Sequence, residues 1–216
     1  MSDNFVASDI FLHKYLELPY NEQEILRYSG CKDAEPGSEV YDLMTRCIDE
    51  VKASKACTYA ICYRMIQIHS MDEEYIDFGI TTASSKDLAK CLSGCNKAVF
   101  MAATIGHEID RIIYRYEKLE PSKAVFMQAI GAERVETMLN AFCDEFGKIY
   151  SEDFGSNLID DIELTPRFSP GYGDLPLAMQ SDFMGILDMS RKLGITLNDS
   201  LLMSPSKSVT AIAGIK

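Results

Sequence analysis

One stretch of the sequence concentrates residue types that could bind a small ligand. It runs Arg167-Phe168-Ser169-Pro170-Gly171-Tyr172-Gly173-Asp174-Leu175-Pro176. The prolines fix the backbone φ angle at their own positions, and the glycines let other atoms approach the backbone closely. The arginine can hold a carboxylate through two parallel hydrogen bonds, and the tyrosine offers an aromatic face. The sequence therefore predicts a stiff binding loop whose backbone could also meet a flat base.

Helices are expected on both sides of this loop. Pro121 can begin a helix whose buried stripe extends to Ile149, because apolar residues recur there at helical spacing. A further helix is expected from Leu177 to Leu193, with Gly194 ending it in a left-handed conformation. Residues 151–176 are rich in glycine, proline and aspartate, so we expect a long loop there.

Earlier in the chain, helical and strand-like patterns follow one another without regular alternation. Ser38 can cap a helix over 40–51, Ser85 can cap a short helix through Leu92, and Gly106 can turn the chain into another helix. Strands are expected at Thr58–Ile68, Tyr75–Ile80, Lys97–Thr104, Leu201–Met203 and Val209–Ile212. This mixture predicts a single-domain α+β fold, with a mixed or antiparallel sheet flanked by helices.

The composition disfavours several classes of protein. The chain has 216 residues, 47% of them hydrophobic, which is enough for one domain with a substantial core. Its formal net charge of −12 disfavours nucleic acids and anionic membranes as partners. No apolar run approaches the roughly 20 residues of a membrane helix, and the start MSDNFVASDI lacks the pattern of a signal peptide. The seven cysteines are scattered without a CxxC pair, which indicates reduced thiols in the cytoplasm.

Candidate metal ligands are present, but none has a recognisable coordinating spacing. Cys91 and Cys95 could share a helix face and hold a metal, although the favoured interpretation is a pair of structural thiols. The other candidates are isolated histidines and acidic residues of the long loop: His13, His69, His107, Asp153, Asp160, Asp161 and Glu163. We therefore expect no metal site, and no residue of this chain is assigned a catalytic role.

The order of motifs after the binding loop resembles one known family. The pattern Arg-x-x-x-Gly-Tyr is followed by Lys192-Leu193-Gly194-Ile195-Thr196-Leu197 and then by Ser200-Leu201-Leu202-Met203-Ser204-Pro205-Ser206-Lys207-Ser208-Val209. Together these blocks, within 167–214, resemble the activation domain of cobalamin-dependent methionine synthase. Residues before 140, including Ala102-Ala103-Thr104-Ile105-Gly106, are similar to the stand-alone version of that domain. The resemblance implies a domain over 31–216, preceded by an N-terminal segment over 1–30.

The resemblance also implies a ligand, S-adenosylmethionine, and residues that hold it. Arg167 would bind its α-carboxylate, the backbone around Ser169 and Gly171 would meet the adenine, and Tyr172 would pack near the ligand. Alternatively, Tyr172 could simply cover the loop as a core residue. Asn140 stands where the family has a ligand-contacting glutamate, and the family's C-terminal tyrosine and N-terminal aspartate have no recognisable counterpart.

By the same resemblance, the protein would assist the reductive methylation of cob(II)alamin on a separate cobalamin-dependent methionine synthase that lacks this domain. The partner would hold the cobalamin, and a flavodoxin-like protein would donate the electron. The sequence contains neither an Asp-x-His-x-x-Gly loop nor an adjacent cysteine pair, so we expect a component of a methyltransferase system rather than a complete enzyme. Two alternatives remain: an accessory protein of another corrinoid methyltransferase, and an interaction module that has lost its ligand.

Overall fold

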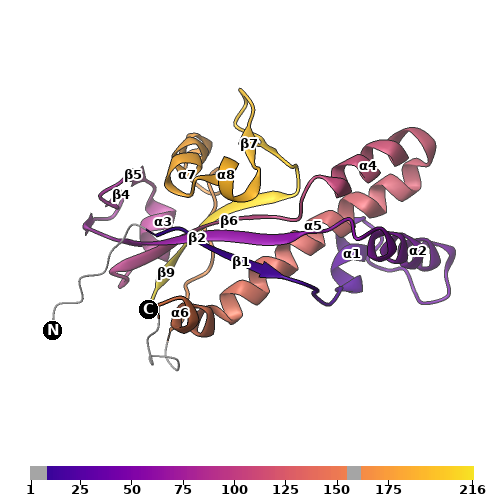
Figure 1. Ribbon diagram of the computed structural model, residues 1–216, viewed down its shortest axis with the longest axis horizontal. Helices are drawn as coiled ribbons and strands as arrows, with labels where there is room; N and C mark the ends of the chain where they lie inside the picture. The colour runs from indigo at the N-terminus through magenta and orange to yellow at the C-terminus, as the bar shows by residue number, and fades with distance from the viewer. Residues whose placement is uncertain (1–8, 155–161) are drawn as a thin grey trace.

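The computed structural model describes residues 9–154 and 162–216. Its centre is a four-stranded antiparallel sheet in the order β1-β2-β6-β9 (Figure 1). The strands are β1 (Phe11–Tyr15), β2 (Tyr59–Gln67), β6 (Lys97–Thr104) and β9 (Ser208–Ile215). Helices flank this sheet, so the α+β class and the antiparallel sheet expected from the sequence are confirmed.

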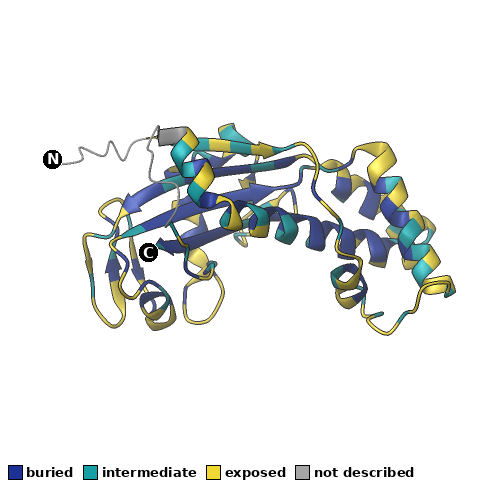
Figure 2. Ribbon diagram, turned by 90° about the horizontal axis from the view of Figure 1, so that it is seen from below, coloured by how far each residue is buried: buried dark blue, intermediate teal, exposed yellow. Residues whose placement is uncertain are grey.

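Both faces of the sheet are covered, and side chains of β6 alternate between two hydrophobic clusters. Val99 and Met101 belong to the cluster on the α5 side, whereas Phe100 belongs to the opposite one. Figure 2 shows that the central strands are mostly buried, as expected for a sheet that is covered on both faces. The first cluster is built on five helices: α1 (Glu22–Tyr28), α2 (Glu39–Ser54), α4 (Glu108–Leu119), α5 (Pro121–Asp144) and α6 (Phe146–Phe154).

The second face is covered by shorter elements. Phe183, Leu187 and Met189 bury against Phe100 and Ile212 there. The helical elements are α3 (Lys86–Cys91), the 3-10 turn η1 (Leu177–Met179), α7 (Gln180–Ile186) and α8 (Met189–Leu193). A small sheet consists of β3 (Ser70–Met71), β4 (Tyr75–Asp77) and β5 (Thr82–Ser84), and a hairpin of β7 (Thr196–Leu197) and β8 (Met203–Ser204).

Where the sequence has a strong period, the structure agrees with it. Ser38 caps α2 by accepting a hydrogen bond from the Tyr41 amide at 3.3 Å, and β6 has the bounds expected for it. The strand expected over Tyr75–Ile80 is shorter and ends at Asp77. The loop expected to begin at residue 151 begins later, because α6 continues to Phe154. None of the helices within the described residues is both long and apolar enough to cross a membrane.

The helix expected over 177–193 is wrong as a single element. Asp188 has a left-handed backbone with φ +49°, and it separates α7 from α8. The residue at the break is neither glycine nor proline, and Gly185 lies inside α7 just before it. Burial of Leu187 and Met189 on either side accompanies it. Gly194 does end α8 in a left-handed conformation, as expected.

Two elements within the N-terminal segment were not expected at all. The strand β1 pairs with β2 over its whole length, and α1 packs Ile25 and Leu26 into the main cluster. Asn21 caps α1 by accepting from the Glu24 amide at 3.2 Å. Both elements are short, so neither shows a pattern long enough to read in isolation.

The turn from β6 into α4 requires glycine at position 106. Gly106 has φ +86°, and a Cβ atom there would lie 2.4 Å from the Thr58 Oγ1. We expect Gly106→Ala to lower the free energy of unfolding by about 1–3 kcal/mol, measured by urea denaturation. Gly185→Ala is the matched control, because Gly185 is helical with open space around it, and it should be neutral or slightly stabilising. Equal effects of the two substitutions would contradict this account of the turn.

Candidate functional site

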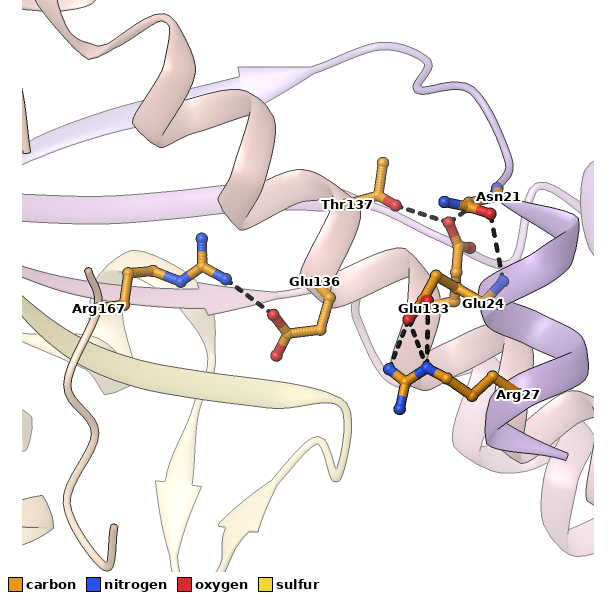
Figure 3. Close-up of polar contacts among 7 residues, drawn as sticks. All are labelled: Asn21, Glu24, Arg27, Glu133, Glu136, Thr137 and Arg167. Carbon is orange, nitrogen blue, oxygen red and sulfur yellow. Dashed lines mark hydrogen bonds and ion pairs between the residues drawn. The ribbon is translucent and has the colours of Figure 1, made fainter. Parts of the chain in front are cut away.

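The segment that carries Arg167 is held against the free edge of β9. Isolated bridges join Leu164 to Ile215 and Phe168 to Ile212. The Phe168 and Ile212 amides each donate to the other's carbonyl at 2.8 Å. The Phe168 side chain packs into the cluster that contains α7, whereas the Arg167 side chain extends to α5 (Figure 3). The local extended backbone therefore sends neighbouring side chains to opposite faces.

On α5, the guanidinium of Arg167 meets a polar stripe. Its Nη2 donates to the Glu136 Oε2 at 2.8 Å, and its Nη1 donates to the Asn140 Oδ1 at 2.9 Å. The Cys143 Sγ lies 3.8 Å from the same Nη1. These partners share one face of α5 because they are spaced by about one turn each. Burial raises the pKa of the Cys143 thiol, while the hydrogen bond from Arg167 acts in the opposite direction.

An open groove of about 400 Å³ runs beside this contact. It is lined by Asn140, Cys143, Asp144, Leu164, Thr165, Pro166 and Arg167. Its volume lies within the range of small-molecule sites. Arg167 is the cation of this groove, while Asp144 in its lining and Glu136 on the guanidinium are acidic, so a zwitterionic or cationic ligand fits its charge better than an anion.

The wall of the groove is fixed to the sheet and to α3. The Thr165 amide donates to the Gly214 carbonyl at 2.9 Å, and the Gly214 amide donates to the Thr165 Oγ1 at 2.8 Å. The Cys91 Sγ lies 3.2 Å from the Pro166 carbonyl oxygen. These contacts hold the backbone on both sides of Pro166, so Arg167 projects from an ordered base.

The turn that follows Arg167 uses its own amides internally. The Tyr172 amide donates to the Ser169 carbonyl at 3.0 Å, and the Gly171 amide donates to the Leu175 carbonyl at 2.9 Å. Tyr172 is 68% exposed, with its ring edge-on to Phe168, so it is not a core residue covering the loop. Carbonyl groups and the aromatic face, rather than these two amides, are what the turn can offer to a ligand.

The sequence-predicted residues thus fall into two neighbouring groups. Arg167 lies on the α5 side with Asn140, while Ser169, Gly171 and Tyr172 form the turn on the side of α3. Glu136 was missed, although it stands one helical turn before Asn140 and that spacing could have revealed it.

The candidate metal ligands that the structure describes do not assemble. Within residues 9–154 and 162–216, no group of three or more His, Cys, Asp or Glu side chains could hold a metal ion. Cys91 contacts the Pro166 carbonyl, and Cys95 is buried against Gly214. Asp160 and Asp161 lie outside the described residues.

Comparison with known proteins gives a match in fold to a solved structure. No family model matches this sequence, and no curated protein matches it. A crystal structure of the MetH reactivation domain bound to AdoHcy is similar in fold, with a TM-score of 0.61 and 13% sequence identity. The match covers 97% of this chain and 79% of that chain. The chain therefore has the fold of a methionine synthase reactivation domain, as its sequence motifs predicted.

Proposed function

We propose that this protein binds S-adenosylmethionine in the groove between α5 and the 164–172 segment. The observation that carries the proposal is the guanidinium of Arg167, held at this groove on a fold that another protein uses to bind AdoHcy. AdoHcy is what remains of S-adenosylmethionine after its methyl group has been transferred. The position of Arg167 and the similarity in fold to an AdoHcy-bound protein therefore both support S-adenosylmethionine as the ligand.

The groups around Arg167 suit the amino-acid end of this ligand. A guanidinium has five N–H donors, and Glu136, Asn140 and the Cys143 Sγ accept from no more than three of them. A carboxylate can take the remaining donors, while the half-exposed Glu136 carboxylate can accept the adjacent α-ammonium group. The acidic surroundings also favour the positive sulfonium, and the turn at Ser169–Tyr172 offers carbonyl groups and an aromatic face to the adenine.

The proposed role is to assist reductive methylation of cob(II)alamin on a separate cobalamin-dependent methionine synthase that lacks this domain. S-adenosylmethionine supplies a methyl cation, and a flavodoxin-like protein supplies the electron. The residues of this chain need only hold the methyl donor in place, because positioning of two reactants by itself lowers the barrier to their reaction. The partner protein holds the cobalamin, and both proteins would work in the cytoplasm.

A second candidate function follows from the same contacts. Arg167 already has an acidic partner at 2.8 Å and an amide partner at 2.9 Å, so its charge is satisfied without a ligand. This favours, as the alternative, an interaction module that keeps the fold and has lost ligand binding. An accessory protein for another corrinoid methyltransferase would use the ligand site described above and differ only in its partner.

Reactivation of a partner tests the proposed function directly. Added to a truncated methionine synthase held as cob(II)alamin, the protein should restore methylcobalamin only when S-adenosylmethionine and a low-potential reductant are both present. The rate should saturate with protein concentration, because an untethered module must find its partner by diffusion. Absorption spectra would follow the conversion.

The control in this assay is an Arg167→Ala/Tyr172→Ala double variant. Conversion at the same rate without the protein, or with this variant, would show that the proposed function is wrong. Calorimetric titration with S-adenosylmethionine and with AdoHcy separates the alternatives: ligand binding without reactivation of methionine synthase favours another corrinoid partner. Absence of binding, with the partner present or not, favours the interaction module.

A further inference from the structure

We infer that Asp174 is a positioning residue for the binding loop over residues 167–176, because it attaches this loop to the first turn of α3. Both carboxylate oxygens take part. Oδ1 accepts from the Ser85 hydroxyl and, at 3.4 Å, from the Asp87 amide, while Oδ2 accepts from the Lys86 amide at 2.8 Å. This inference rests on the proposed function, because it concerns how that site is held.

The contact joins segments far apart in the chain. Ser85 itself caps α3 by accepting from the Leu88 amide at 3.0 Å, and the residue is 1% exposed. Asp174 therefore attaches to a buried, already ordered cap rather than to a mobile surface group. The carboxylate also serves the free amides at the start of a helix, where a negative charge is favoured.

The backbone next to Asp174 is shaped for this contact. Gly173 has φ +55°, and a Cβ atom there would lie 2.6 Å from the Asp87 Oδ2 and 3.2 Å from the Phe168 ring. Glycine adopts this backbone angle without strain, and a side chain there would have to displace the Asp87 carboxylate and press on the Phe168 ring. The close approach of Gly173 to Asp87 and the carboxylate contacts of Asp174 are separate observations, and both place this part of the loop against the start of α3.

The loop is thus held at both of its ends. Phe168 pairs with β9 at its start, and Leu175 with Asp174 secures its end on the α3 side. Tyr172 lies between these two anchors and stays exposed. Hydrogen bonds from the Ser85 hydroxyl and the α3 amides lower the pKa of the Asp174 carboxyl, so the group is ionised at neutral pH and the contact is present there.

Loss of this contact should let the loop leave its binding conformation. Apparent affinity falls in proportion to the population that remains competent to bind. We expect Asp174→Ala to weaken AdoHcy binding by about fivefold, the usual size of a lost capping interaction. Asp174→Asn should recover only part of the affinity, because its amide keeps one accepting oxygen but loses the second one and the negative charge.

The experiment combines calorimetry on the full chain with hydrogen exchange of the ligand-free protein. Asp174→Ala should speed the exchange of the Gly171 and Leu175 amides, which close the turn, and Asp174→Asn should do so to a smaller extent. The matched control is Asp182→Ala, since the Asp182 carboxylate is likewise exposed and accepts from the Thr81 hydroxyl at 3.1 Å, outside the loop. The control should change neither loop exchange nor affinity.

Two results would overturn the inference. One is unchanged loop exchange in Asp174→Ala. The other is unchanged AdoHcy affinity in Asp174→Ala despite faster exchange, because the anchored loop would then not matter for binding. Normal exchange combined with a loss of affinity would make Asp174 a direct ligand contact. If the unmodified protein binds neither AdoHcy nor S-adenosylmethionine, the proposed function fails, while the exchange measurement still decides whether Asp174 orders the loop.

Discussion

Arg134→Ala is expected to lower the free energy of unfolding by about 3–5 kcal/mol, the largest effect of any substitution considered for this protein. The Arg134 side chain is completely buried, and its guanidinium pairs with Glu133 at 2.5 Å. It also donates to the carbonyls of Leu18 at 2.9 Å and Pro19 at 2.5 Å, and it lies 3.6 Å from the centroid of the Tyr20 ring. Truncation would leave a buried carboxylate and two carbonyls without these donors.

The same pair ties the N-terminal residues to α5. Glu133 accepts from the Asn21 amide at 3.0 Å and from the Thr137 hydroxyl at 2.6 Å (Figure 3). The connection between β1 and α1 is therefore fixed through one buried ion pair. We expect Glu133→Ala to be severely destabilising as well, because it would leave the Arg134 charge uncompensated.

Urea denaturation of single variants measures this effect. Arg111→Ala is the matched control, since Arg111 pairs with Glu108 at 3.0 Å on the surface and should contribute no more than about 1 kcal/mol. If Arg134→Ala lowers the free energy of unfolding no more than Arg111→Ala does, the buried pair does not hold the N-terminal elements in place. At equal m-values, the urea midpoints rank the stabilities of the two variants directly.

Arg167→Ala is expected to weaken S-adenosylmethionine binding by about 1.5–3 kcal/mol, the usual contribution of a hydrogen bond to a charged group. The substitution removes the donors for the ligand's carboxylate, and it leaves Glu136 and Asn140 without their partner. Arg167→Lys should recover only part of the affinity, because an ammonium group cannot make the two parallel bonds of a guanidinium. Calorimetric titration of the three proteins gives the comparison.

Arg191→Ala serves as the control for this series. Arg191 is 82% exposed and pairs with Asp188 at 2.6 Å on α8, so its removal changes the net charge equally and should leave the affinity unchanged. Equal affinities of the unmodified protein, Arg167→Ala and Arg167→Lys would remove Arg167 from the site. A loss as large in Arg191→Ala would instead indicate that overall charge governs binding.

Local patterns in the sequence were enough to predict much of the fold. The helical period over 40–51 and the apolar run at Lys97–Thr104 identified α2 and β6, because a long element repeats its buried positions often enough to be read. The order of motifs after Arg167 predicted the fold that the structural comparison supports. Short elements such as β1 and α1 gave too few repeats, and the break at Asp188 has only weak local signals, because an isolated glycine and an aspartate also occur within helices.

The sequence did contain a signal for the burial of Arg134, although its residue type alone would predict an exposed side chain. It stands four residues after Ile130 and four before Met138, both fully buried, so the helical period alone places it on the inner face of α5. A charged residue on that face demands partners. Those partners, the Leu18 and Pro19 carbonyls, come from a segment more than a hundred residues away, which periodicity cannot supply.

The sequence by itself determined which loop carries the candidate site, because the composition and order of its residues are local properties. Only the tertiary structure decided which residues of other elements this loop contacts. Arg167 reaches Glu136 and Asn140, 31 and 27 residues earlier, because the 164–168 backbone lies along β9 and sends this side chain to the α5 face. Asp174 reaches Ser85 across 89 residues on the opposite face. Such contacts depend on how the sheet orders its strands and covers its two faces, and that arrangement is set by packing of the whole chain.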